Sequence, residues 1–587
     1  MIFRLSTISL LIVLAIAYNA RTQNIPGNPT VHGNFQIDAQ TYHPDEALGI
    51  TDSLLQGKMM GMNSYGDIRF SMWRFNAGIR YEAYMPPLDG FDEQYQGHGI
   101  PYWFVEYGDE KLQVTAGHFY EQFGMGMILR SYQDWDLGYD NSLNGFRVKY
   151  NPVNGLYFKG LIGTHRYYWE PFKDNNRGVV RGLDGEMVFN DIFNALKEKK
   201  TRIILGGSFV SKYEKMRTKS MVIDTIRYEY QLPHNVASTA GRITLLRGGF
   251  NFYTEYVHKF NNPSAFNNFI YKDGQALLSS LSYSQKGLGI YVAAKRIDNM
   301  SYKSRMTELE DVLDINYIPP LTKQFVYSLE NIYPYATQMD GEAAIQGQVV
   351  YTIPRGSKLG GKYGTKLEFN YSRVHGLDKQ PVADGIPVDS TGTLGYKAPW
   401  FSFGDLYYQG INFTFDKRIG RLFKLTLEYL QSIYNIAVIE EHPGKKVYSH
   451  VFLADFTWKI NTTNSIRFEG GLLCIPEYYI ATSLKDPIPK LKKKDDPNLD
   501  KGDWAMFMVE YNIAPKWFFS IMDQYNYGNP DKDMRLHYYT ASVAYVQGPH
   551  RFALAYGRQR EGLICVGGIC RQVPASSGFT INVSTSF

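Results

Sequence analysis

The chain contains 587 residues, of which 44% are hydrophobic, 15% aromatic and 20% charged, and its 62 basic and 57 acidic residues leave a formal charge of +5. This near balance excludes the strongly basic composition that is typical of nucleic-acid-binding proteins, so no nucleic-acid partner is expected. Three cysteines are too few for a disulfide scaffold and lack the spacing of a zinc or redox site, so we expect no cofactor.

Residues 1–23 are typical of a secretory signal peptide. Arg4 precedes an apolar run, and Ala15 and Ala17 form the small-residue pattern of a cleavage site. A retained membrane anchor is the alternative, but it would need roughly 18 apolar residues, and this run ends too early. We expect cleavage between residues 17 and 23, which leaves residues 24–587 as a single domain.

Apolar and polar residues alternate along nearly the whole of that domain. In RFNAGIRYEAY, residues 74–84, apolar side chains from Phe75 onward share one side of an extended strand and polar ones share the other. The predicted strands, about 24 in number, cover residues 31–42, 64–72, 75–85, 98–107, 111–120, 145–151, 155–165, 180–190, 201–212, 236–246, 249–260, 273–284, 288–297, 342–353, 363–375, 404–416, 421–434, 447–459, 465–475, 503–512, 516–526, 535–546, 550–560 and 577–587. A soluble β-sandwich would show the same alternation.

The lengths of the connections favour a membrane barrel. Short links such as YGDEK, NPVNG and QGPH follow the even-numbered strands, and longer ones follow almost every odd-numbered strand. One even-side link, NDIFNALKEKK at residues 190–200, is longer and predicts one or two helical turns. The predicted fold is all-β: a transmembrane antiparallel β-barrel of about 24 strands, within a range of about 20 to 26, with short periplasmic turns and long outer loops. We expect it in the Gram-negative outer membrane with both termini periplasmic.

The apolar face of these strands would contact outer-membrane lipid, and the opposite face would line the lumen. The charged residues predicted to line the pore are Arg80, Glu82, Arg147, Lys149, Lys159, Lys366, Glu368, Lys424, Glu428, Arg467 and Glu469. Because both signs occur together, they predict a hydrated passage for polar solutes without strong charge selection. The alternative is that each charge pairs with a neighbouring strand and braces the interior.

The connection EQFGMGMILRSYQDWDLGYDNSLNG, residues 121–145, is the densest candidate for a specific function. Its apolar run MGMIL is unusual for an exposed loop, so we expect it to fold inward and narrow the pore; an ordinary packed loop is the alternative. The predicted constriction residues are Gly124, Gly126, Arg130, Asp134, Asp136, Asp140 and Asn141. Calcium binding by the aspartates is a weaker hypothesis, because DWDLGYDN does not match the EF-hand spacing.

Residues 298–341 form the longest connection. Pro319, Pro320 and Pro334 exclude a regular membrane strand there. The apolar and aromatic content is nevertheless high for a free loop, and an exposed patch of that kind needs cover. We therefore expect the connection to cap the barrel or to bind a partner protein.

Catalytic motifs give no support to an enzyme. The chain lacks the G-x-S-x-G of serine hydrolases and the H-E-x-x-H of metalloproteases. Enzymes that are themselves membrane barrels assemble their sites from separate strands, so this absence weighs little. We predict that the protein is not an enzyme.

The stretch GLICVGGICR predicts a hairpin in one of the outer loops. If Gly567 and Gly568 form a two-residue turn, Cys565 lies opposite Cys570 at a position where side chains are closest. We expect a disulfide between them, with two free thiols as the alternative.

The chain ends with GFTINVSTSF, an alternating strand that stops on Phe587. A barrel needs such a strand because its last strand pairs with its first. Terminal aromatic strands of this kind resemble the signal that the barrel-insertion machinery recognises, so we expect Phe587 to act in assembly.

The segments VTAGHFYEQFGMGMILRSY, LGYDNSLNGFRVKY and YIPPLTKQFVYSLENIYPYATQ resemble an uncharacterised family of outer-membrane proteins from Bacteroidota. The resemblance implies an outer-membrane barrel and supplies no activity. The function we expect is a porin-like channel for small polar solutes with a lumen narrowed by an inward-folded loop. The alternative is a non-conducting subunit of an outer-membrane secretion or assembly complex. A plugged TonB-dependent receptor is less expected, because no globular plug domain precedes the strands.

Overall fold

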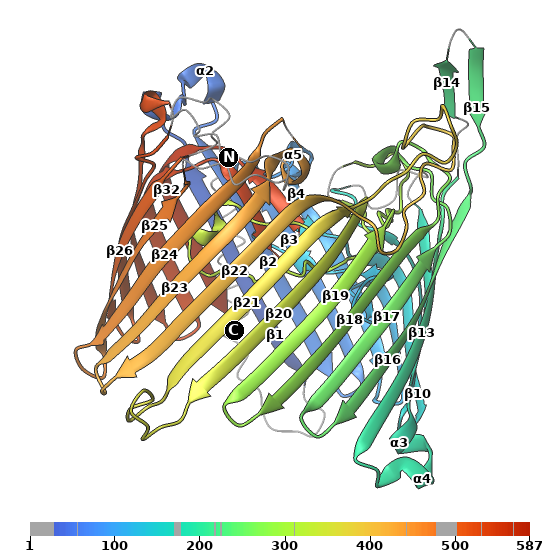
Figure 1. Ribbon diagram of the computed structural model, residues 1–587, viewed down its shortest axis with the longest axis horizontal. Coiled ribbons are helices and arrows are strands. Elements are labelled where there is room, and N and C mark those ends of the chain that lie inside the picture. Colours follow the sequence, from blue (N-terminus) through green and yellow to red (C-terminus); the bar gives the residue numbers. More distant parts are fainter. Residues whose placement is uncertain are drawn as a thin grey trace, which may run out of the picture.

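The protein forms one antiparallel sheet of 24 strands that closes into a barrel, shown in Figure 1. Each strand pairs with the next one along the barrel. The computed structural model describes residues 29–55, 57–169, 178–215, 219–223, 226–309, 312–441, 443–476, 502–529, 531–566 and 569–587. The predicted signal peptide lies outside these residues. The fold predicted from the alternating pattern is confirmed.

The barrel strands match the predicted ones in order and approximate position. They are β1 (Thr30–Thr41), β2 (Met60–Met72), β3 (Phe75–Tyr84), β4 (Gly97–Gly108), β5 (Leu112–Phe119), β10 (Leu143–Val153), β11 (Leu156–His165), β12 (Val179–Val188), β13 (Thr201–Tyr213), β16 (Asn235–Arg247), β17 (Phe250–Lys259), β18 (Gly274–Gln285), β19 (Leu288–Asp298), β20 (Gly341–Ile353), β21 (Thr365–Leu377), β22 (Phe403–Ile419), β23 (Phe423–Asn435), β24 (Lys446–Lys459), β25 (Asn464–Cys474), β26 (Trp504–Ile513), β27 (Trp517–Tyr525), β28 (His537–Gln547), β29 (His550–Gln559) and β32 (Ser576–Ser586). Each pairs with its neighbours through an antiparallel ladder, so the backbone polar groups are satisfied within the sheet.

The remaining elements belong to the connections. They are the short strands β6 (Gln122–Phe123), β7 (Leu129–Arg130), β8 (Gln133–Asp134), β9 (Tyr139–Asp140), β14 (Lys219–Ile223), β15 (Ile226–Tyr230), β30 (Gly562–Val566) and β31 (Ile569–Val573), the helices α2 (Asp52–Leu55), α3 (Phe189–Ile192), α4 (Asn194–Lys197) and α5 (Ile436–Ile439), and the 3-10 turns η1 (Glu46–Leu48), η2 (Glu93–Tyr95), η3 (Ala265–Asn267), η4 (Glu330–Ile332) and η5 (Lys532–Met534). Most long connections leave one end of the barrel, at the top of Figure 1. The helical turns predicted at residues 190–200 are α3 and α4, at the other end. The link of residues 354–364 on that side is also long, although the prediction named only residues 190–200 as an exception to the short links.

The last strand closes the barrel. β32 pairs with β29 on one side and with β1 on the other. The amide of Phe587 donates to the carbonyl of Gly33 at 2.9 Å, and the amide of Gly33 donates to the carbonyl of Phe587 at 3.0 Å. The Phe587 ring lies over Gly33, where a Cβ atom would be only 2.3 Å from the ring, so a larger residue at position 33 would displace the ring. The terminal residue therefore belongs to the closing seam, and its role as an assembly signal stays a prediction.

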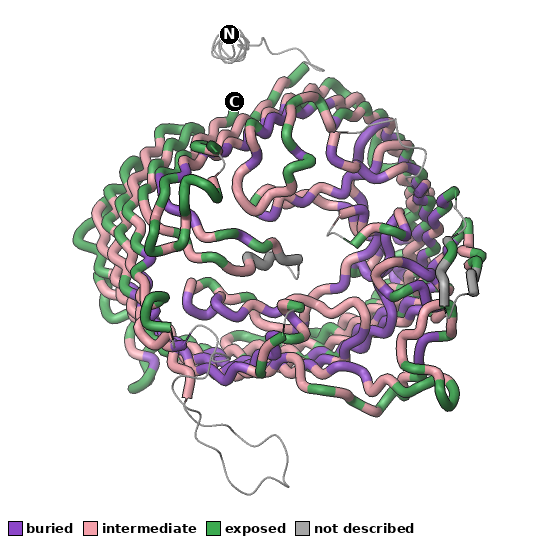
Figure 2. The backbone as a smooth tube through the Cα atoms, turned by 90° about the horizontal axis from the view of Figure 1, so that it is seen from above, coloured by how far each residue is buried: buried purple, intermediate pink, exposed green. Residues whose placement is uncertain are grey.

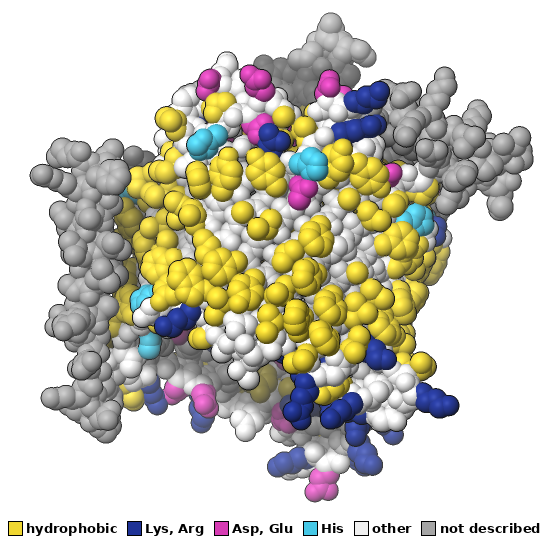
Figure 3. Space-filling model, turned by 90° about the vertical axis from the view of Figure 1, so that its left-hand side faces the viewer, with side chains coloured by type: hydrophobic (Ala, Val, Ile, Leu, Met, Phe, Trp, Pro, Cys, Tyr) yellow, Lys and Arg dark blue, Asp and Glu magenta, His cyan; other side chains and the backbone are white. Residues whose placement is uncertain are grey.

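The outer face of the barrel is apolar. Large side chains that the alternation turns outward are exposed, for example Phe146 at 61% and Leu183 at 64%. Figure 3 shows such side chains as a continuous band, with charged residues gathered above and below it. No helix in the described part of the chain is long and apolar enough to cross a membrane. An apolar band around a closed barrel is the surface that a bilayer covers.

Candidate functional site

Two long connections lie inside the barrel. The first inserted segment, residues 120–142, joins β5 to β10, and the second inserted segment, residues 299–340, joins β19 to β20. Backbone hydrogen bonds link the two segments, from Arg130 N to Ile315 O at 2.9 Å and from Tyr317 N to Gly126 O at 3.0 Å. Figure 2 shows buried stretches of chain within the ring of strands. We call the two segments together the plug.

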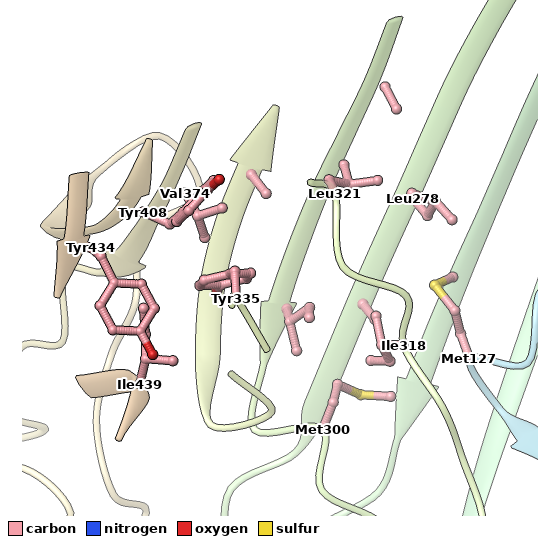
Figure 4. Close-up of a cluster of buried hydrophobic side chains, with 14 of the residues drawn as sticks. Met127, Leu278, Met300, Ile318, Leu321, Tyr335, Val374, Tyr408, Tyr434 and Ile439 are labelled. Atoms are coloured by element: carbon pink, nitrogen blue, oxygen red, sulfur yellow. The ribbon is translucent and has the colours of Figure 1, made fainter. Parts of the chain in front are cut away.

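An apolar core joins the plug to the inner wall. From the first inserted segment, Phe123, Met127 and Ile128 are fully buried, so the run MGMIL is indeed an inward-folded core. From the second, Ile315 and Ile318 pack into the same cluster. Figure 4 shows side chains of both segments beside wall residues from β18, β21, β22 and β23. Burial of this apolar surface stabilises the inserted position of both segments.

Much of the apolar surface of the second inserted segment is therefore buried inside the barrel, although Leu309 and Val326 are exposed. Met300, Tyr302 and Leu329 have at most 1% of their surface exposed. The Tyr302 hydroxyl donates to the wall carbonyl of Val236 at 2.8 Å. The apolar content that we interpreted as a cap or a partner surface is used within the chain, and a protein partner at residues 298–341 stays a prediction without that support.

Buried ion pairs fix the first inserted segment to β2 and β3. Asp140 accepts from Arg80 at 3.3 Å and from Arg166 at 2.8 Å. Arg166 also pairs with Glu82 at 2.7 Å, and Arg80 pairs with Asp67 at 3.0 Å. The arginines hold the pKa of Asp140 below its usual value, although burial acts in the opposite direction.

This cluster corrects the prediction for Arg80 and Glu82. Both face inward as expected, but the side chain of Glu82 is 0% exposed and that of Arg80 only 3%. The Arg80 guanidinium lies between the rings of Tyr102 and Trp135, at 4.6 and 4.7 Å from their centroids. They anchor the plug and do not line a hydrated passage, because residues distant in sequence cover them.

A second charged anchor surrounds Glu121. Its carboxylate lies 3.3 Å from Arg147, 3.2 Å from Lys149 and 2.9 Å from Lys159. Burial disfavours the charged form of the Glu121 carboxyl, but these three cations hold the pKa of Glu121 below its usual value. Arg147 also pairs with Glu106 at 3.1 Å. All three predicted pore residues thus meet on one carboxylate of the first inserted segment.

Glycines allow the close approach of this segment to the wall. Gly124 has φ of 54°, and a Cβ atom there would be 2.5 Å from the carboxylate of Glu255. The next amide, Met125 N, donates to that carboxylate at 2.9 Å. Gly126 also has positive φ, 94°. Both predicted glycines have a left-handed backbone; Gly124 brings the segment against β17, and Gly126 turns it beside Arg130 of the same segment.

The other predicted constriction residues act within the plug. The Arg130 guanidinium lies over the Tyr317 ring at 4.1 Å, and the Asn141 side chain donates to Asp314 O at 2.8 Å. Asp134 accepts from the amide of Leu137 at 3.1 Å.

The aspartates of the plug do not form a metal site. Asp140 is taken by the arginines, Asp134 caps its own turn, and Asp136 is exposed. Among the residues that the structure describes, no group of three or more His, Cys, Asp or Glu side chains is placed to hold a metal ion. The calcium hypothesis therefore gains no support.

Three wall lysines that the sequence did not single out hold the second inserted segment. Lys212 donates to Lys303 O at 2.7 Å, Lys259 to Ser301 O at 2.6 Å, and Lys295 to Pro319 O at 2.6 Å. All three are buried. In the sequence, these lysines are marked only by their positions on the lumen-facing side of β13, β17 and β19, close to the strand ends. Lysines exposed to water would occupy the same kind of position.

The predicted residues on β21, β23 and β25 do remain on the lumen wall, in pairs. The grouped contacts are Lys366 with Glu368 at 2.9 Å, Lys323 with Glu428 at 2.6 Å, Lys424 with Asp416 at 2.8 Å, and Arg467 with Asp455 and Glu510, both at 2.9 Å, and with Glu469 at 2.5 Å. Half of the side-chain surface of Lys366 and Lys424 is exposed. Lys424 and Arg467 pair with carboxylates of neighbouring strands, as the bracing alternative proposed. Lys366 pairs within its own strand, and Glu428 pairs with Lys323 of the second inserted segment.

A cavity of about 510 Å³ lies between the plug and the wall formed by β27, β28, β29, β32 and β1. Its lining includes Asn331 and Pro334 of the second inserted segment and Gln524, Tyr538 and Arg560 of the opposite side. Its size falls within the range of small-molecule sites. This space beside the plug is lined by both polar and apolar side chains, and a small solute can occupy it.

The β30–β31 hairpin contributes to the same region. Leu563 and Val573 line the cavity, and β30 contacts η4 of the plug. Cys565 pairs in register with Cys570, as predicted. The side chains of both cysteines and the turn at Gly567 and Gly568 lie outside the described residues, so the disulfide stays a prediction.

A family model described as a family of unknown function, DUF6029, matches residues 4–587. The chain belongs to the DUF6029 family. A comparison with curated protein sequences finds no match. The family supplies no activity, so the function has to be argued from the barrel and its plug.

Solved structures of low similarity share the barrel architecture. The siderophore receptor PirA from Pseudomonas aeruginosa is 8% identical, with 96% of this chain and 81% of that chain covered and a TM-score of 0.40. The outer-membrane transporter YddB from Escherichia coli is 8% identical, with 96% and 81% covered and a TM-score of 0.35. The outer-membrane protein opdK from Pseudomonas aeruginosa is 9% identical, with 76% and 97% covered and a TM-score of 0.33. We draw no functional conclusion from them.

Proposed function

We propose that this DUF6029 protein is an outer-membrane channel for small polar solutes whose lumen is narrowed by two of its own connections. The observation that carries the proposal is the division of the inner wall. One part is covered by the plug, and the other part keeps paired, partly exposed charges such as Lys366 on β21 and Lys424 on β23 and, further around the wall, the cavity between β27 and β1. Water and small polar molecules can follow the second part.

The proposed passage has weak charge selection. A ring of one sign would bias ion passage, but here both signs lie together, because Lys366 pairs with Glu368 and Lys424 with Asp416, and Arg467 lies among Asp455, Glu469 and Glu510. Such a wall favours neutral and zwitterionic solutes. We place the protein in the Gram-negative outer membrane with the short connections and both termini in the periplasm, as the parity of connection lengths suggests.

Liposome swelling tests the proposal. Purified protein is reconstituted and exposed to sugars and amino acids of increasing size, beside a variant in which residues 303–334 are replaced by a short Gly-Ser linker. We expect slow swelling with the wild type, and faster swelling with a larger size limit for the variant. The matched control removes the strands β14 and β15, which form a separate two-stranded sheet outside the barrel in Figure 1, and should behave as the wild type. Absence of swelling with all three proteins would overturn the proposal.

A further inference from the structure

The outer wall carries a depression that solute passage does not use. It lies on the membrane-facing side of β18 to β21, near the ends of these strands that bear the long connections, and has a volume of about 470 Å³. Small side chains, Ser279, Ala294 and Ala343, form its floor, and Leu277 and Ile345 rise beside them. The shape is that of an apolar trough in a surface that faces lipid.

The connection between β21 and β22 forms the outer wall of the depression. Its Trp400 and Phe401 reach the depression together with Phe403 at the start of β22. Phe401 is 92% exposed, although it is large and apolar. Aromatic side chains at this level of a barrel lie where the polar headgroups of the bilayer begin. The trough therefore opens toward lipid chains and ends near their headgroups.

Arg373 places a positive charge at that end. Its guanidinium donates to His375 Nε2 and to Gln409 Oε1, both at 2.8 Å. No carboxylate among the described residues pairs with Arg373. Asp405, which acts electrostatically on His375, is paired with Lys446. An arginine held in one position on a lipid-facing wall without a counter-ion attracts an external anion, because an unpaired charge at the membrane is costly.

Arg296 adds a second guanidinium. It lines the same depression, donates to Ala398 O at 2.9 Å and lies over the Trp400 ring at 4.5 Å. Its nearest carboxylate, Asp298 at 3.5 Å, is shared with Lys272 at 3.6 Å. One carboxylate thus serves two cations, and the polar end of the depression keeps a positive excess.

We propose that the depression binds one phosphorylated glycolipid of the outer leaflet, of the lipid A type. An acyl chain lies on the floor of small side chains, and a phosphate group accepts hydrogen bonds from Arg373, since guanidinium groups match phosphate geometry. Arg296, whose side chain is only 7% exposed, adds positive charge beside Trp400. The inference rests on the placement given under the proposed function, because the long connections put the depression at the outer leaflet. The inference does not depend on whether solutes pass through the barrel.

Native mass spectrometry of the purified, detergent-solubilised barrel with added diphosphoryl lipid A tests this site. The wild type should retain one lipid A molecule, and Arg373→Gln should lower its affinity at least about tenfold, the effect expected when one hydrogen-bonded charge is lost. The matched control is Arg181→Gln, two residues from the outer end of β12, whose guanidinium lies over Tyr213 on the outer face but not in the depression. It should bind as the wild type does.

Phe401→Ser provides a second variant. Because Phe401 is almost fully exposed, this substitution removes no packing contact on which folding depends. It should also weaken lipid A binding while leaving channel activity unchanged. Equal binding by Arg373→Gln, Phe401→Ser and wild type would overturn the site. Phosphatidylglycerol binding as tightly as lipid A would overturn the assignment to a glycolipid. Neither result depends on whether the barrel conducts, so failure here is distinguishable from failure of the proposed channel.

Discussion

The two inserted segments are held in the same barrel by different chemistry. Both contribute to one apolar core, and the first is fixed in addition by buried ion pairs, with Asp140 and Glu121 each enclosed by cations. The second is fixed by apolar burial and by wall lysines that donate to its backbone. Charges depend on a few exact partners, whereas apolar contact is spread over many residues. The first segment should therefore respond sharply to one substitution, and the second more gradually.

Loss of a central charge should give the largest effect. Arg166→Met leaves Glu82 and Asp140 buried without their main partner, and breaking a buried pair typically costs about 3–5 kcal/mol. We expect the free energy of local opening of the first inserted segment to fall by about that amount. Hydrogen exchange of peptides from residues 121–142 measures it.

The matched control for this substitution is Arg202→Met, whose pair with Asp191 is largely exposed near α3. Exposed pairs contribute little, so exchange should remain as in the wild type. Unchanged exchange in Arg166→Met as well would contradict the idea that ion pairs hold the first segment.

Removal of a core side chain tests the second segment. Ile315 is fully buried, and Ile315→Ala should cost about 2–5 kcal/mol through lost apolar contact and a cavity. Faster hydrogen exchange within residues 299–340 is the expected result. Val326→Ala, in the same segment but at a side chain 89% exposed, should have no effect. If both variants exchange alike, apolar burial is not what holds this segment.

A pH titration should give the smallest and most graded effect. Burial, followed by repulsion from Glu428, raises the pKa of Glu330 from 4.5 to about 9. Between these values the inserted segment holds a proton that the withdrawn segment releases, so the stabilisation is complete below pH 4.5 and is lost as pH rises toward 9. The slope is about 1.4 kcal/mol per pH unit.

The substitution Glu330→Gln should remove that slope, because the amide does not titrate. Hydrogen exchange of residues 299–340, corrected for the intrinsic effect of pH, compares the two proteins. An equal slope in both would assign the pH dependence to another group.

The barrel could be predicted from the sequence because strand alternation and connection parity are local patterns. The sequence analysis did not recognise the link of residues 354–364 as an exception to the short links. The alternation of short and long connections describes their lengths but gives no physical reason for them. The run MGMIL predicted an inward-folded loop because such side chains do not stay in water. The closing position of Phe587 also followed from the pattern.

The remaining features depend on contacts between distant residues. Burial of Glu82 requires Arg166, and burial of Lys259 requires the carbonyl of Ser301. The apolar content of residues 298–341 favours a partner surface and an internal core equally, because composition does not show which surface will cover it. Only the folded chain distinguishes these alternatives.

Single-channel recording in planar bilayers tests the central claim most directly. The wild type and the variant with residues 303–334 replaced by a Gly-Ser linker are inserted under identical conditions. We predict small conductance steps for the wild type and clearly larger ones for the variant, because the second inserted segment occupies part of the lumen. Steps of equal size in both proteins, or no steps in either, would contradict a channel narrowed by its own plug.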